Sequence, residues 1–416
     1  MVSPPHSRRT LLLGLTAGLA ASALPAPFIR PAQASVTAIR IGLGLAPQAQ
    51  SPIDQRAVRF GVEAALRQAN GRALGLPVQV VPFEETDAAT TAKALRDLVR
   101  DQGIVGLIGG ATDATALSLR QDAAEARVPL IIHSAMADAV TGPSCDRWTY
   151  RIPAPIGAQL RALRPYLAEY ARRWFVLTAP DDADDHALTL ARAGMDASGA
   201  TEAGRAELDP RQEALDGVVA AIRNSGADAV LSCVTGPATT RFLKAWAAAG
   251  LKDRMPLAQV GATDTELWAA GPQLVTGIHT KTYHARNPRN PPEARELAAA
   301  YGRQFNGDLP PATMFQAHVA MAALLSSLSH AGTTDPARVV AALDHFGSPF
   351  GDMTLRFTRD DHQMMHRIAI LETKTKIRTR QDFWDVEAFA PEKPDELEAF
   401  YAAAAGGSAA CAARKV

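Results

Sequence analysis

The chain has 416 residues, 47% of them apolar and 6% aromatic, which is enough for two domains with cores of their own. Its 43 basic residues only balance its 43 acidic ones. Without a basic excess, binding to DNA, RNA or an anionic membrane surface is not expected. The wide spacing of Cys145, Cys233 and Cys411 excludes a disulfide scaffold and a paired-cysteine zinc site, but leaves a Cys145–Cys233 bridge open.

Residues 1–34 are predicted to be an export signal rather than part of the fold. The pair Arg8-Arg9 precedes an apolar run from Leu11, and an A-x-A cleavage pattern ends at Ala34. The arginine pair is typical of a twin-arginine signal, and a Sec signal is the alternative. We therefore expect a periplasmic protein that is cleaved near Ala34.

Strands and helices alternate after the signal. Strands are predicted at 39–45, 78–83, 105–110 and 130–135, with helices at 54–69, from 86 and from about 114 to 126. Val58, Val62 and Leu66 share one face of the first helix, as in an amphipathic helix packed on a sheet. Continuous apolar strands that alternate with such helices indicate a doubly wound, parallel α/β layer.

The same alternation restarts at Trp174. Strands are predicted at 174–180, 201–208, 229–235 and 257–261, with helices from 184, 210 and 237. An extended stretch at 277–284, helices at 293–305, 313–330 and 335–343, and strands at 353–357 and 368–374 follow. The predicted fold class is therefore α/β, with two doubly wound parallel-sheet lobes.

Segments spread over the whole predicted mature chain resemble one known family. They are RIGLGLAP, GVEAALRQANGR, EETDAATTAKALRDLV, VGLIGG, RVPLIIHSA and MTLRFTRDDHQ. In order and spacing they resemble the type I periplasmic solute-binding proteins, in the leucine/isoleucine/valine-binding branch that serves ABC importers. No single segment is diagnostic.

The resemblance implies two lobes joined by a hinge of three crossings. The expected boundaries are 1–34 for the signal, 35–152 plus 280–347 for lobe 1, 153–279 plus 348–390 for lobe 2, and 391–416 for a tail with a disordered end. The crossings are expected near 152–155, 277–283 and 348–357.

By the resemblance, and by the general rule for open α/β sheets, a ligand lies beyond the carboxyl ends of the strands. The candidate contacts of lobe 1 are Thr112, Asp113, Thr115, His133, Ser134, Ala135 and Met136. Amides at the start of the helix that follows Gly109-Gly110 could receive an anionic or carbonyl oxygen. Two alternatives stay open. Thr112 and Asp113 could only cap that helix, and His133 could be purely structural.

The opposite wall departs from the family. Amino-acid binders are similar in having an acid at the end of a lobe 2 strand and a tyrosine in a DDxYG-like loop. Here the loop reads PDDADDHA without a tyrosine, and Gly261 stands near the place of the acid, with Asp264 as a substitute that cannot be assumed. A buried ammonium without a carboxylate partner is costly.

We therefore expect a neutral or acidic solute rather than a standard amino acid, bound by Thr235 and Thr263, with Tyr283 on the cleft floor. An Asp113 side chain inside the pocket would disfavour an anion. For Tyr283 the alternative is an aromatic residue packed in the hinge.

Motifs for catalysis, cofactors and metals are missing. The chain has no G-x-S-x-G, P-loop or G-x-G-x-x-G pattern that could support an enzyme or a cofactor site. PDDADDHA lacks the spacing of an EF-hand loop, and the pair His362 and His366 lacks the HExxH glutamate and is expected in a turn before a strand. We expect neither an enzyme nor a metal protein.

The sequence thus predicts a monomeric carrier that closes around a small polar organic solute. Its expected partners are the permease and ATPase subunits of an ABC importer. The alternative is a periplasmic sensor that presents its liganded form to a receptor.

Overall fold

The computed structural model describes residues 37–141, 145–179, 186–209, 212–358, 360–377 and 379–404. The predicted signal peptide, most of the acidic loop at 180–187 and the last part of the predicted tail lie outside these ranges. Within them, no helix is long and apolar enough to cross a membrane.

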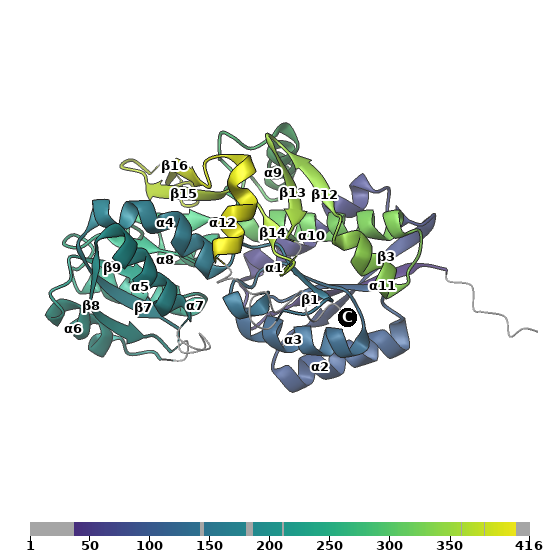
Figure 1. The fold of residues 1–416 in the computed structure, drawn as a ribbon, viewed down its shortest axis with the longest axis horizontal. Helices are drawn as coiled ribbons and strands as arrows, with labels where there is room; N and C mark the ends of the chain where they lie inside the picture. Colours follow the sequence, from purple (N-terminus) through teal and green to yellow (C-terminus); the bar gives the residue numbers. More distant parts are fainter. Residues whose placement is uncertain are drawn as a thin grey trace, which may run out of the picture. The chain divides into compact units, whose positions relative to one another are not determined.

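The first lobe is built on a six-stranded sheet of order β2-β3-β1-β4-β5-β6 (Figure 1). Its strands are β1 (Ile39–Leu45), β2 (Arg72–Ala73), β3 (Leu76–Glu84), β4 (Gly106–Gly109), β5 (Leu130–Ile132) and β6 (Thr149–Arg151). Its helices are α1 (Pro52–Gln68), α2 (Ala88–Asp97), which continues into a π-helical turn (Leu98–Gln102), α3 (Asp113–Ala126), α10 (Ala312–Ala331) and α11 (Pro336–Leu343). Only the short β2 pairs antiparallel, so the predicted parallel layer is confirmed.

The second lobe contains a seven-stranded sheet of order β16-β15-β11-β10-β9-β7-β8. Its strands are β7 (Arg173–Thr178), β8 (Thr201–Glu207), β9 (Ala229–Ser232), β10 (Leu257–Gln259), β11 (Ile278–Lys281), β15 (Ile368–Thr373) and β16 (Trp384–Ala390). Helices α4 (Ile156–Tyr170), α5 (His186–Ser198), α6 (Asp216–Asn224), α7 (Pro237–Ala248) and α8 (Asp264–Ala270) belong to this part of the chain, and α9 (Pro292–Gln304) follows β11. The sheet is mixed, because β15 and β16 form an antiparallel edge that the sequence did not predict.

The third crossing lies later in the chain than predicted. The predicted segment 348–357 falls in an antiparallel hairpin of β12 (Gly347–Phe350) and β13 (Met353–Phe357), which forms a three-stranded sheet with β14 (Met364–Met365). The chain enters the second sheet only between β14 and β15. His366 lies in that connection, and its Nε2 is 3.2 Å from the carbonyl oxygen of Ile152 in the first crossing.

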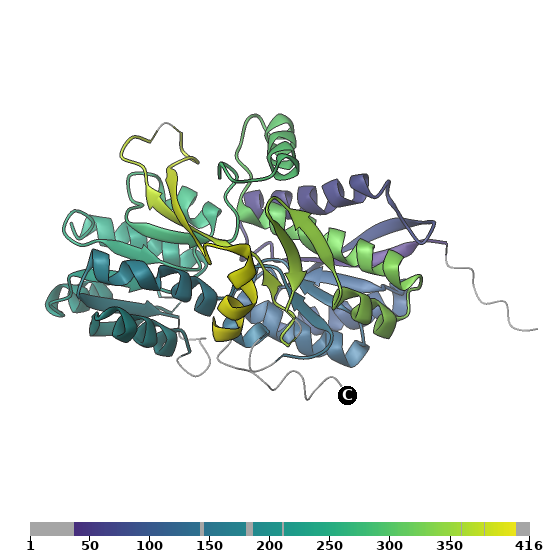
Figure 2. The same ribbon diagram turned by 45° about the horizontal axis from the view of Figure 1, so that its top comes forward.

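A C-terminal helix, α12 (Leu397–Ala404), packs beside these crossings, next to α4 and β14 (Figure 2). Leu397 and Tyr401 share an apolar cluster with Ala154 and Ile368, and the Tyr401 hydroxyl donates to the carbonyl oxygen of His366 over 3.0 Å. The beginning of the predicted tail is therefore part of the fold.

The cysteines do not form the bridge that the sequence left open. Cys145 is disulfide-bonded, whereas Cys233 is a buried thiol in the second lobe. These two residues are therefore not paired with each other.

The core of the first lobe depends on close packing of α1 against α10. Gly61 faces the backbone of α10, and a Cβ atom at this position would overlap the carbonyl oxygen of Met314 and crowd the amide of His318. The long, apolar α10 is buried over most of its length, as expected for a helix in the interior of a lobe.

We predict that Gly61→Ala lowers the free energy of unfolding by about 2 kcal/mol or more, because the added methyl group must push two helices apart. Gly217→Ala is the matched control, since Gly217 is an exposed helical glycine with open space around it. That variant should be neutral or up to about 1 kcal/mol more stable. Urea denaturation measures both, and equal effects would contradict the packing argument.

Candidate functional site

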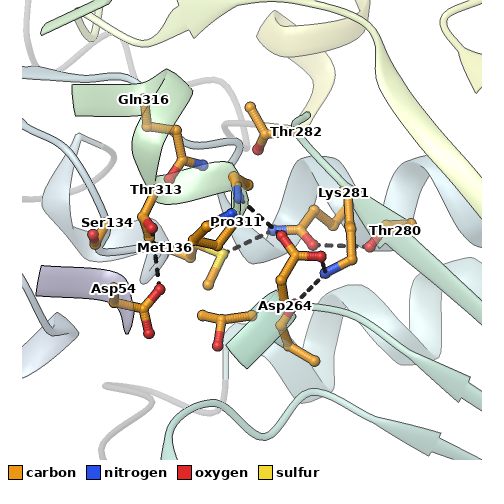
Figure 3. A pocket seen from close by; sticks show the side chains of 14 residues that line it. Asp54, Ser134, Met136, Asp264, Thr280, Lys281, Thr282, Pro311, Thr313 and Gln316 are labelled. Atoms are coloured by element: carbon orange, nitrogen blue, oxygen red, sulfur yellow. Dashed lines mark hydrogen bonds and ion pairs between the residues drawn. The ribbon is translucent and has the colours of Figure 1, made fainter. Parts of the chain in front are cut away.

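Loops of both lobes line a cleft of about 300 Å³. An inner chamber of about 30 Å³ adjoins it (Figure 3). The two spaces share Asp54, Ser134, Met136, Thr263 and Thr313 in their walls. The larger volume lies at the lower end of the range for small-molecule sites.

Most of the predicted contacts lie on the cleft wall: Thr112, Asp113, Ser134, Ala135, Met136, Thr235 and Thr263. Thr115, His133 and Tyr283 line neither the cleft nor the chamber. The predicted loops thus line the cleft, although not every side chain within them points into it.

Thr115 faces away from the cleft because the first loop is built around a buried carboxylate, that of Glu85. The two carboxylate oxygens accept hydrogen bonds from the amides of Gly110 (2.8 Å) and Ala111 (2.9 Å), and from the Thr115 hydroxyl (2.5 Å). A side chain at Gly44 would overlap this carboxylate. Burial raises the pKa of Glu85, and these hydrogen bonds oppose the rise.

Thr112 and Thr115 also form a capping box at the start of α3. The Thr115 amide donates to the Thr112 hydroxyl (3.2 Å), and the Thr112 amide donates to the Thr115 hydroxyl (3.1 Å). Thr112 therefore caps the helix, as the alternative had it, although it still borders the cleft, whereas the side chain of Asp113 does not cap α3.

Asp113 joins the first loop to the second. Its Oδ1 accepts hydrogen bonds from the amides of Met136 (2.6 Å) and Ala137 (2.8 Å), while its Oδ2 lies 3.5 Å from the hydroxyl of Thr235 in the other lobe. Four amides of these loops, those of Gly110, Ala111, Met136 and Ala137, are thus engaged by two carboxylates of the chain itself, Glu85 and Asp113.

His133 has the structural role that the sequence left open. It is fully buried, with Nε2 3.3 Å from the carbonyl oxygen of Gly44 and Nδ1 2.7 Å from the Ser134 hydroxyl. Burial lowers the pKa of His133 to about 4. A neutral ring that donates from Nε2 and accepts at Nδ1 satisfies both contacts.

Tyr283 is packed in the second crossing. Its ring stacks on Phe315 with centroids 4.4 Å apart, and its hydroxyl donates to the carbonyl oxygen of Ala294. This placement matches the alternative stated from the sequence, in which Tyr283 is an aromatic residue packed in the hinge.

Helix α8 presents two acids to the site. Thr263 and Glu266 form a capping box, in which Glu266 Oε2 accepts the Thr263 amide at 3.0 Å. Glu266 also lines the cleft, and burial raises its pKa to about 8. Asp264 lines the chamber, but its carboxylate is paired with Lys281 Nζ at 3.0 Å and accepts the Ala312 amide at 2.8 Å.

Asp54 joins elements of both lobes. Its carboxylate accepts hydrogen bonds from the hydroxyls of Ser51 (2.8 Å), Thr313 (3.1 Å) and Thr265. Burial raises the pKa of Asp54 in spite of these bonds. The only sequence signal for Asp54 was its place three residues after Ser51, which caps α1.

We predict that Glu85→Gln destabilises the protein by about 2–3 kcal/mol, because the new NH₂ group faces donors that need an acceptor. Glu84→Gln, at the exposed neighbouring position, should change the free energy of unfolding by less than about 0.5 kcal/mol. Chemical denaturation of both variants tests the role of Glu85. A Glu85→Gln protein as stable as the control would refute it.

Comparisons with known proteins agree on the fold. Residues 38–378 match a family model described as periplasmic binding protein. A periplasmic binding protein of Burkholderia mallei is 21% identical, with a TM-score of 0.77 over 86% of this chain and 96% of that one. A leucine-binding protein of Thermotoga maritima MSB8 is 17% identical, with a TM-score of 0.74 over 86% of this chain and 100% of that one.

A further solved structure is a solute-binding protein of an ABC transporter from Rhodopseudomonas palustris BisB5, in complex with 3,4-dihydroxybenzoic acid. It is 15% identical, with a TM-score of 0.75 over 85% of this chain and 97% of that one. A comparison with curated protein sequences found no match. The family match covers most of the chain, and the neighbours share its two-lobed fold. The chain therefore belongs to the periplasmic binding protein family, with the type I fold, and is a solute-binding protein rather than an enzyme.

Proposed function

We propose that this protein is exported to the periplasm, with cleavage near Ala34, and acts there as a monomeric carrier for an ABC importer. Its solute is a small, polar organic molecule without a carboxylate group, and therefore not a standard amino acid. Solved neighbours named as ABC transporter substrate-binding proteins support the class of partner, a permease with its ATPase subunits.

The proposal on the solute rests on one observation, the engagement of the loop amides by Glu85 and Asp113. A carboxylate ligand would need donors from these loops to offset its loss of hydration. Here it would instead face the acceptor oxygens of Asp113 and Asp54 in the cleft wall. A neutral solute avoids that repulsion.

The proposed mechanism is capture by closure of the lobes. Hydrogen bonds from Thr265 to Asp54 and from the Ala312 amide to Asp264 already connect them around the chamber. A solute that contacts both walls favours this closed arrangement over an open one. The permease then binds a surface that forms only when the two lobes are closed.

We predict the outcome of a thermal-shift screen of residues 35–416 against amino acids, aromatic and aliphatic carboxylates, amides and alcohols. Neutral amides or alcohols should stabilise the protein, since specific binding adds about 2.7 kcal/mol at a hundredfold excess over Kd. Leucine, valine and benzoate should give no shift. A shift with any of these three would contradict the proposed solute class.

We also predict that Thr265→Val weakens binding of the solute found in that screen by about fivefold to tenfold, because the closed form loses a hydrogen bond to Asp54. Thr201→Val, on the exposed side of β8, is the control and should bind as the wild type does. Titration calorimetry measures the affinities. Equal affinities in the two variants would show that this contact does not support closure.

A further inference from the structure

We infer that Gln316 recognises the head group of the solute, and that this head group carries both a hydrogen-bond donor and an acceptor, as a primary amide or an alcohol does. The inference rests on the proposed function and narrows it to one residue and one kind of functional group.

Gln316 lies in the first turns of α10, where the helix borders the inner chamber (Figure 3). Its side chain is only 5% exposed. Most residues of α10 are apolar and pack into the core of the first lobe, so an amide at this position is not required by packing. Gln316 instead places a polar group where α10 borders the chamber.

The other polar side chains around the chamber are already paired. Gln159 Oε1 accepts from the Gly261 amide (2.9 Å) and the Thr280 hydroxyl (2.8 Å), and its Nε2 donates to the carbonyl oxygen of Ala154. Lys281 is paired with Asp264, and Asp54 receives its three hydroxyls. These groups hold the walls of the chamber together.

The Gln316 amide, in contrast, has no hydrogen-bond partner among the residues that the structure describes, and no dashed line reaches it in Figure 3. The Gln316 amide is not among the fully enclosed unpaired polar groups of the described residues, so it is open to the chamber that it lines. A group inside the chamber can therefore reach it. A solute in the chamber would provide both a donor and an acceptor.

The hydrogen-bond donors and the acceptor of the Gln316 amide distinguish between possible head groups of the solute. Gln316 presents two N–H donors and one carbonyl acceptor. A carboxylate can only accept, which leaves the carbonyl unpaired and adds a negative charge near Asp54. An ammonium can only donate, which leaves the N–H groups unpaired. A hydroxyl or a primary amide satisfies both sides, and it is neutral.

The dimensions suit a small head group on an aliphatic body. The chamber, at about 30 Å³, has room for a group of about one or two water-sized units. The body of the solute would extend into the wider cleft past Met136, Ala135 and Pro237. In the described part of the chain no aromatic side chain lines either space, so the walls offer no ring on which an aromatic solute could stack.

The test uses four probes with one carbon skeleton: butyramide, 1-butanol, butyrate and butylammonium. Affinities are measured by calorimetry for the wild type, for Gln316→Leu, and for Gln304→Leu at an exposed position of α9 as control. We expect the wild type to prefer butyramide or 1-butanol. The affinity of Gln316→Leu for these two probes should be lower by about tenfold or more. Gln304→Leu should match the wild type.

A second readout separates recognition from a folding defect. Leucine is close to glutamine in size and needs no hydrogen bonds, so Gln316→Leu should be at least as thermally stable as the wild type when no solute is present. A stable variant with reduced affinity supports the inference.

Three results would overturn it: unchanged affinity in Gln316→Leu, a wild-type preference for butyrate or butylammonium, or binding of none of the four probes. If the broader screen then finds a carboxylate or amine that binds, the carrier function stands, whereas the proposed solute class and the assignment of Gln316 both fail. If that screen also finds nothing, the proposed function fails with it.

Discussion

The buried carboxylate of Glu85 is the constraint on which the first lobe's half of the site depends. By holding the amides of Gly110 and Ala111 and the Thr115 hydroxyl, it determines the path of the chain from β4 into α3. The start of α3 in turn places Asp113, which holds the amides of the second loop. One internal carboxyl group therefore organises both loops. The amides of Gly110 and Ala111 that it holds are not available to a ligand.

The acids at the lobe interface act mainly as acceptors for the protein's own groups. Asp54 and Asp264 receive hydroxyls, an amide and an ammonium from two helices and one strand, and these bonds connect the two lobes. A count of charged residues in the wall would suggest an ionic ligand. The partners of those residues argue instead for a neutral one, because little of their hydrogen-bonding capacity is left. Gln316 is the exception, since its amide is not used by the fold.

Local patterns in the sequence predicted much of the fold and only part of the site. Apolar strands and the long helix of residues 313–330 were evident because their periodicity is continuous, whereas β16 alternates weakly and was missed. Thr112 and Met136 were found because they follow predicted strands directly. Asp54 and Gln316 belong to helices far from those loops in sequence, and only tertiary packing brings them together. The side chains of Thr115 and His133 point into the core and not into the cleft. This direction likewise depends on Glu85 and Gly44, which are distant in the chain.

Helix α12 makes the C-terminal segment a component of the molecular joint. It touches Ala154 and Ile368 beside two crossings, and Tyr401 bonds to the backbone between β14 and β15. The helix therefore packs against the segments at which the chain passes between the lobes. A purification tag or fluorescent reporter placed close behind α12 would lie near these crossings. Surface sites on the individual lobes are better positions for probes of motion.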